Sequence, residues 1–116
     1  NGNFHNNTID SYAFSSKYPC LYVDFNEMIS NNCVLLSQNS VKTDFWGNPV
    51  LLYEGLKIIG YMQDENIDGI RDDLIVAGNC MKNTSGEFPY VRWLLEFSSK
   101  IYFISDMKKE NVNLFL

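Results

Sequence analysis

Short apolar runs separated by turn residues dominate the hydrophobic pattern of this chain. The runs are rich in Val, Ile, Leu, Tyr and Phe, which is typical of β-strands. Clusters of Gly, Asn, Asp, Ser and Pro lie between them and favour turns. No stretch longer than about ten residues repeats its apolar positions at the spacing of an amphipathic helix. We therefore predict strands at 20–25, 33–37, 50–53, 56–62, 74–81, 90–97 and 100–104.

The segment 90–97 has the clearest alternation of its side chains. Successive side chains of a strand point to opposite faces, and one face of this segment is wholly apolar. That face is predicted to point into the core: Val91, Trp93, Leu95 and Phe97. Ser98 and Ser99 then predict a hairpin turn into the strand at 100–104. Gly78, inside the run 74–81, marks a candidate bulge or bend.

Short strands without helices predict an all-β fold, either a small SH3-like barrel or a β-sandwich. At 116 residues, the whole chain 1–116 is expected to form a single domain. Residues 1–16 are rich in Asn and Ser and are expected to form a loose, irregular N-terminal extension. We expect a short helical turn or a loop at 26–32, and an edge strand or a docked segment at 112–116.

The negative charge of the chain is concentrated in the window 64–73. Fourteen acidic and nine basic residues give a formal net charge of −5. The window alone contributes −4, from one arginine, Arg71, and five carboxylates. Because a dense acidic loop repels itself, three interpretations arise: it holds a cation, contacts a basic partner, or is a solvated hairpin loop. The five carboxylates are Asp64, Glu65, Asp68, Asp72 and Asp73.

Part of this window matches a calcium-binding loop. Asp64, Asn66 and Asp68 alternate and are followed by Gly69, as in the pattern D-x-[DN]-x-[DN]-G. The position that should provide the closing bidentate Glu is Ile75, and no flanking helices are predicted. We therefore expect no bound metal ion and no cofactor, and keep calcium only within an alternative function.

The sequence offers no arrangement of residues for catalysis. The single histidine, His5, lies in the polar N-terminal segment, so a nucleophilic Ser or Cys lacks its base. There is no Gly-rich phosphate loop. Asp72 and Asp73 are neighbours in the chain, and in a strand they would point to opposite faces rather than across a cleft. We expect that the protein is not an enzyme.

The cysteines and the overall charge restrict the environment and the partners of the protein. Cys20, Cys33 and Cys80 form no C-x-x-C pair, so either all three are reduced and buried or Cys20 is bridged to Cys33. A pI near 4.6 argues against nucleic acid and anionic membranes as partners. No run reaches the roughly 18 apolar residues of a membrane span. We expect a cytoplasmic protein, or a periplasmic one if a signal peptide preceded Asn1.

Three aromatic residues beside turns are candidate contacts for a partner. Trp46 precedes Gly-Asn-Pro, and either folds over the end of the barrel or stands exposed as an anchor. Tyr53 and Tyr61 are expected to flank the same turn end as Glu54, and either join an interface with the acidic window or stack across strands.

From about Ser37 to Asp106, the order of features resembles small bacterial immunity proteins of contact-dependent growth inhibition and other polymorphic toxin systems. The segments that carry the resemblance cover a little over half of the chain: Leu52–Leu56, Asp64–Gly69, Asp73–Gly78, Val91–Trp93 and Ser105–Asp106.

The resemblance implies a non-enzymatic immunity protein that neutralises a cognate toxin, with a nuclease as the expected toxin, by occluding its basic active-site groove. The expected partner is thus a basic protein domain, with no direct contact to nucleic acid. The expected partner-binding residues are Asp64, Glu65, Asp68, Asp72, Asp73, Trp46, Tyr53 and Tyr61. The alternative is a β-barrel adaptor or accessory domain that binds a peptide or a calcium ion.

Overall fold

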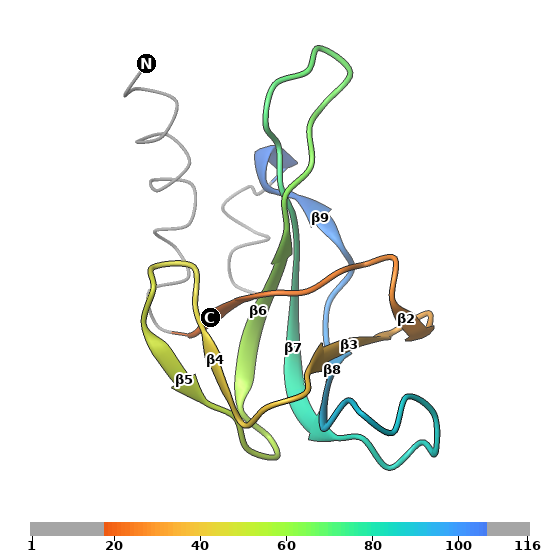
Figure 1. The fold of residues 1–116 in the computed structure, drawn as a ribbon. Coiled ribbons are helices and arrows are strands. Elements are labelled where there is room, and N and C mark those ends of the chain that lie inside the picture. Colours follow the sequence, from red (N-terminus) through yellow and green to blue (C-terminus); the bar gives the residue numbers. More distant parts are fainter. Residues whose placement is uncertain (1–17, 107–116) are drawn as a thin grey trace.

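The computed structural model describes residues 18–106, and these form an all-β domain (Figure 1). The prediction of an all-β fold is confirmed. The predictions for residues 1–16 and 112–116 lie outside the described residues. The elements in chain order are β1 (Cys20–Tyr22), β2 (Met28–Ser30), β3 (Cys33–Ser37), β4 (Val41–Thr43), β5 (Pro49–Leu51), β6 (Lys57–Met62), β7 (Leu74–Lys82), β8 (Trp93–Phe97), β9 (Tyr102–Phe103) and a 3₁₀ turn, η2 (Ile104–Asp106).

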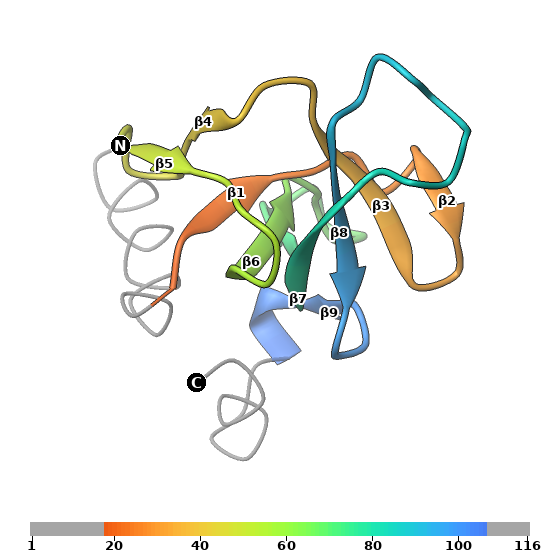
Figure 2. The same ribbon diagram turned by 90° about the horizontal axis from the view of Figure 1, so that it is seen from below.

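Seven of the strands form one mixed sheet. Its order is β1-β6-β7-β8-β3-β2, and β9 pairs with β7. β1 runs parallel to β6, while the remaining neighbours are antiparallel. β4 and β5 form a separate two-stranded sheet. The sheet is curled (Figure 2). Within residues 18–106 no ladder joins its edge strands β1 and β2, so its hydrogen bonding does not close into a complete barrel.

The sheet curls around one main core. Buried side chains from β1, β3, β6, β7 and β8 pack together, and they include Leu21, Val34, Ile58, Val76 and Leu95. These strands span nearly the full width of the sheet, which is curled in Figure 2. The apolar cluster therefore joins side chains from across the whole sheet. The predicted apolar face of 90–97 is confirmed for Trp93 and Leu95, which are buried in the main core, and for Phe97, which is half-buried against it. Val91 precedes β8 and is buried in a separate cluster with Leu94, so its predicted place on this face is wrong.

The predicted hairpin at Ser98 and Ser99 is wrong. β8 pairs with residues 78–82 of β7, and β9 pairs with residues 74–75 of the same strand. β8 and β9 therefore follow one another along one edge of β7 instead of pairing together. Between them, Ser98 donates its N–H to the Ala77 carbonyl and Ser99 Oγ accepts the Ala77 N–H at 2.9 Å. A side-chain oxygen thus replaces a ladder carbonyl, and the two serines form an interruption in a continuing edge.

Two further elements differ from the predictions. Residues 26–32 contain the strand β2 instead of a helical turn, and Met28 pairs there with Val34. β4 was not predicted because its single apolar residue, Val41, is surrounded by polar neighbours. It forms through pairing with β5, where Val41 lies opposite Leu51.

The three cysteines are buried, and none of them forms a disulfide. They lie in β1, β3 and β7, which agrees with the interpretation that all are reduced. Burial, with a contribution from Glu54, raises the pKa of the Cys80 thiol to about 11. Burial and the negative charge of Glu96 also raise the pKa of Cys33. The reactive thiolate form is therefore scarce at neutral pH for both residues.

We expect the folded protein to react slowly with an aromatic disulfide reagent at pH 8, because all three thiols are buried and the pKa values of Cys33 and Cys80 are raised. Absorbance of the released thiolate should show no rapid equivalent from the native protein and three equivalents in denaturant. One equivalent released within the mixing time from the native protein would contradict this expectation.

Candidate functional site

The acidic window forms the far end of the β6–β7 hairpin, which projects beyond the rest of the sheet (Figure 1). Asp72 donates its N–H to the Asp64 carbonyl at 2.8 Å, and Asn66 donates to the Ile70 carbonyl at 2.9 Å. The Gly69 N–H bonds to the Asn66 carbonyl at 2.9 Å and closes the turn. Gly69 has φ +75°, a conformation that glycine adopts without steric cost. The window is therefore a hydrogen-bonded hairpin tip.

Side-chain oxygens inside this tip bond to the backbone of the tip itself. Asn66 Oδ1 accepts the N–H groups of Asp68 at 2.9 Å and Ile70 at 3.0 Å. Asp64 Oδ1 accepts the N–H of Glu65 at 2.8 Å. Two of the oxygens that matched the calcium pattern thus stabilise the turn. Within residues 18–106, no group of three or more His, Cys, Asp or Glu side chains is placed to hold a metal ion.

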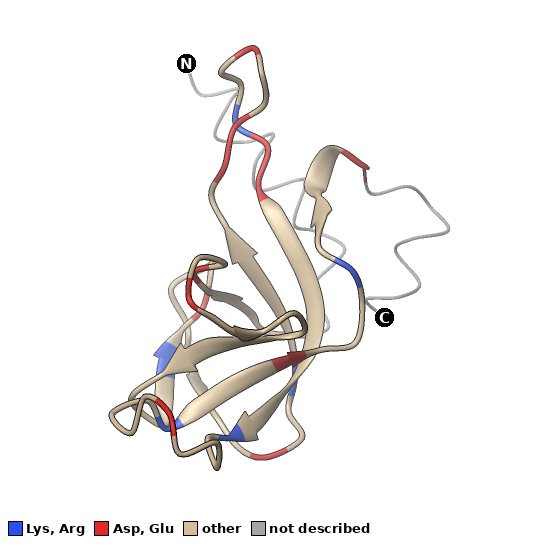
Figure 3. Ribbon diagram, turned by 90° about the vertical axis from the view of Figure 1, so that its right-hand side faces the viewer, with Lys and Arg blue, Asp and Glu red and all other residues tan. Residues whose placement is uncertain are grey.

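The tip exposes two isoleucines among its carboxylates. Ile67 is fully exposed, at 101% of its reference area, and Ile70 is exposed at 57%. Glu65 and Asp68 are exposed beside them, and Asp64 is half-buried. Figure 3 shows the acidic positions on both arms of the projecting hairpin. Ile67 and Ile70 were not among the predicted contact residues, although two apolar residues inside an acidic turn are a recognisable sequence signal.

Asp72 and Asp73 do not belong to the exposed surface. Asp72 is 8% exposed and Asp73 is 1% exposed. Asp72 accepts two hydrogen bonds from Ser105, one from its N–H at 2.9 Å and one from its hydroxyl at 2.6 Å. Arg71 Nε and Nη2 donate to the two carboxylate oxygens of Asp73 at 2.9 and 3.0 Å. The two aspartates therefore fix the base of the hairpin, and the window presents three carboxylates to solvent instead of five.

The predicted aromatic anchors fall in different places. Trp46 is exposed on the β4–β5 turn, with its ring edge-on to Phe45 at 5.4 Å. Phe45 in turn lies 5.3 Å from the ring of Tyr61, which is half-buried. Burial, reinforced by nearby acidic groups, raises the pKa of Tyr61. Tyr61 is thus a packing residue near the hairpin base, and Trp46 stands at the outer end of this aromatic row.

Tyr53 is exposed, but it lies before β6, whereas the acidic tip follows β6. The two features are therefore at opposite ends of one strand. The structure brings together Asp64, Glu65 and Asp68 at the tip, and it separates Tyr53 from them.

No protein-family model matches the chain, and searches of curated proteins and of solved structures give no match either. Among residues 18–106, no helix has the length and apolar character needed to span a bilayer.

Proposed function

We propose that the protein is a non-enzymatic immunity protein that binds and neutralises a cognate basic toxin domain. The tip of the β6–β7 hairpin enters the active-site groove of the toxin and blocks its substrate. If the toxin is a nuclease, the carboxylates of the tip occupy positions that substrate phosphates would take. The observation that carries the proposal is the exposed Ile67 surrounded by the carboxylates of Asp64, Glu65 and Asp68.

The composition of the tip supports a role in binding. A fully exposed isoleucine at a hairpin tip gains nothing for the fold, because its burial in this chain is nil. Buried against a partner, its side chain would contribute roughly 2 kcal/mol. The neighbouring carboxylates increase the rate of encounter with a basic surface and help to exclude wrong partners.

The rigidity of the tip supports the same role. The bonds from Asn66 Oδ1 and the backbone pairs across the hairpin hold the turn in one conformation. A preorganised loop loses little conformational entropy on binding. The ion pair of Arg71 with Asp73 and the bonds of Asp72 to Ser105 fix the direction in which the hairpin projects.

No observation favours the alternative of a calcium-binding adaptor. Asp72 and Asp73 are the carboxylates nearest to the position of the missing closing Glu, and they bond to Ser105 and Arg71.

The decisive experiment uses the toxin domain encoded immediately upstream in the native genome. Expression of that domain in a sensitive host should arrest growth, and co-expression of this protein should restore growth. Purified toxin and immunity protein should form a complex that elutes as one species. Growth arrest that persists despite normal expression of this protein would contradict the proposal.

Substitutions at the tip should weaken that complex in two distinct ways. Asp68→Lys should slow association about tenfold and reduce its salt dependence, because steering by charge is lost. Ile67→Ser should accelerate dissociation about tenfold, because an apolar anchor is lost. Surface plasmon resonance at two salt concentrations separates the two effects.

Glu96→Lys is the matched control for charge, since Glu96 is exposed on β8, away from the tip. This variant should bind as the parent protein does. Equal rates for the parent, Asp68→Lys and Ile67→Ser would place the interface elsewhere.

A further inference from the structure

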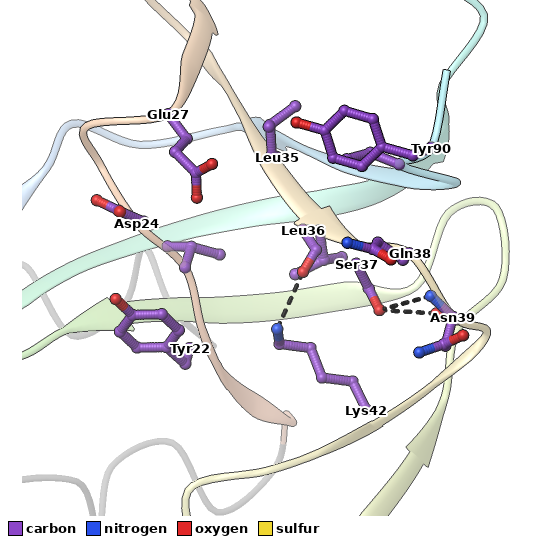
Figure 4. A pocket seen from close by; sticks show the side chains of 12 residues that line it. Tyr22, Asp24, Glu27, Leu35, Leu36, Ser37, Gln38, Asn39, Lys42 and Tyr90 are labelled. Atoms are coloured by element: carbon purple, nitrogen blue, oxygen red, sulfur yellow. Dashed lines mark hydrogen bonds between the residues drawn. The ribbon is translucent and has the colours of Figure 1, made fainter. Parts of the chain in front are cut away.

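A second surface lies beside the sheet, outside the acidic hairpin tip. There, a cavity of about 420 Å³ opens between the end of β1, the segment 23–27, the end of β3, the start of β4 and Tyr90 (Figure 4). Tyr90 follows the far end of β7, whereas Tyr22 pairs with Tyr61 near the base of the hairpin. The cavity therefore extends along the sheet between these two places, and no residue of the window 64–73 lines it.

Two carboxylates line one side of this cavity. Asp24 is half-buried and accepts the Asn26 N–H at 2.9 Å through Oδ1. Glu27 is exposed beside it (Figure 4). Within residues 18–106, neither of these carboxylates forms an ion pair. The salt bridge in this part of the chain joins Arg71 to Asp73, outside the cavity. Two adjacent carboxylates without a basic counterpart favour a cationic ligand.

Two tyrosines stand on either side of the opening. Tyr22 is 45% exposed and Tyr90 is 58% exposed, and both line the cavity (Figure 4). Exposed tyrosines are common binding residues, because each offers a large rigid ring with a polar end. The face of a tyrosine ring also attracts cations, and a guanidinium group can stack on it.

The loop 83–91 holds Tyr90 in place. The Asn83 side-chain amide donates to the carbonyls of Glu87 at 2.8 Å, Phe88 at 3.1 Å and Val91 at 3.0 Å. Phe88 has φ +50°, an unfavourable conformation for a bulky residue, and its ring meets that of Tyr90 edge-on at 6.3 Å. Strained backbone of this kind concentrates at binding sites, where the surrounding structure maintains it.

Lys42 lies on the side of the cavity opposite the carboxylates (Figure 4). Its Nζ donates to the Leu36 carbonyl at 3.0 Å and sits 6.0 Å from the centre of the Tyr22 ring. Burial lowers the pKa of this amine. The amine repels a second cation, so it leaves the carboxylate side of the cavity as the place where a cation binds.

We propose that this cavity receives the guanidinium group of an arginine side chain presented by a protein partner. The guanidinium pairs with Asp24 and Glu27, and Tyr22 and Tyr90 pack against it and its aliphatic stem. Arginine fits better than lysine because its planar group bonds to carboxylates in a bidentate way and stacks on aromatic rings. If the partner is the toxin domain, the cavity is a second contact, and in that respect alone the inference rests on the proposed function.

The test uses N-acetyl-L-arginine amide as the probe, titrated into the ¹⁵N-labelled protein and followed by two-dimensional NMR. We expect saturable shifts at the amides of Tyr22, Glu27 and Tyr90, with a dissociation constant in the millimolar range, and none at the hairpin tip. N-acetyl-L-citrulline amide, which has the same shape without the charge, should bind at least about fivefold more weakly.

Two variants make the test specific. Asp24→Asn/Glu27→Gln keeps the acceptor for Asn26 but removes both charges, and should abolish the saturable shifts. Lys42→Met removes the competing positive charge and should tighten binding two- to threefold by a reduction in repulsion. Equal binding of the arginine and citrulline probes, or unchanged binding by the double variant, would overturn the proposal. Preferential binding of free arginine would also overturn it, in favour of a site for an amino acid.

The same reagents separate this inference from the proposed function. Failure of growth rescue with retained arginine binding would contradict the immunity role and keep the cavity as a docking site. Growth rescue without any binding of the arginine probe would support the immunity role and overturn the proposal of an arginine site in the cavity.

Discussion

Gly78→Ala should destabilise the protein by about 3 kcal/mol, because the added methyl group meets backbone. A Cβ at this position would lie 2.5 Å from the carbonyl oxygen of Glu96 and 2.9 Å from Leu95 Cδ1. A carbonyl in a ladder cannot rotate away as a side chain can, so β7 and β8 would have to separate locally. Because β7 is paired with β6, β8 and β9, that separation would disturb the centre of the sheet.

Two other glycines provide graded controls for this prediction. Gly60→Ala places its Cβ 2.8 Å from Leu95 Cδ2, a side-chain atom that can move, so a loss of roughly 1–2 kcal/mol is expected. Gly47→Ala meets nothing within 4 Å, but φ is +89°, so its cost of about 1 kcal/mol is conformational. Urea denaturation followed by tryptophan fluorescence gives the three free energies of unfolding. A loss at Gly78 no larger than that at Gly47 would show that β7 and β8 are less tightly apposed.

The strands that consist of contiguous, buried apolar residues could be predicted from the local sequence. β3 was predicted with its observed ends, and β6 and β7 were predicted to within one residue, because their apolar residues are contiguous and end at turn residues. β8 begins three residues later than predicted, because the Asn83 side chain ties the carbonyls of Phe88 and Val91 into a loop. The parallel pairing of β1 with β6 depends on contacts far apart in the chain and left no local signal.

The candidate site was predictable only in part, for the same reason. Charge density identified the hairpin, and alternation around Gly69 suggested a turn, both of which are local properties. The burial of Asp72 was not predictable, because its partner Ser105 is 33 residues away. The pairing of Asp73 was readable, since Arg71 lies two residues earlier and thus on the same face of an extended chain.

Arg71→Met should destabilise the protein by about 3 kcal/mol. Asp73 is 1% exposed, and the Arg71 guanidinium bonds to both of its carboxylate oxygens. Removal of the guanidinium leaves the buried carboxylate without that bidentate partner, and water cannot readily replace it. Lys100→Met is the matched control, because Lys100 is an exposed cation in the connection between β8 and β9. Its free energy of unfolding should change by less than about 0.5 kcal/mol.

The double variant Arg71→Met/Asp73→Leu distinguishes loss of the ion pair from loss of packing. With both charges absent, no carboxylate remains buried at position 73, and at least half of the stability lost in Arg71→Met should return. The hairpin tip should still become more mobile, because the bidentate contact at its base is gone. Hydrogen exchange at Asn66 to Ile70 should therefore accelerate in the double variant even where global stability recovers. A recovered stability with unchanged exchange would mean that the turn bonds of Asn66 alone hold the tip, and that partner binding does not depend on Arg71.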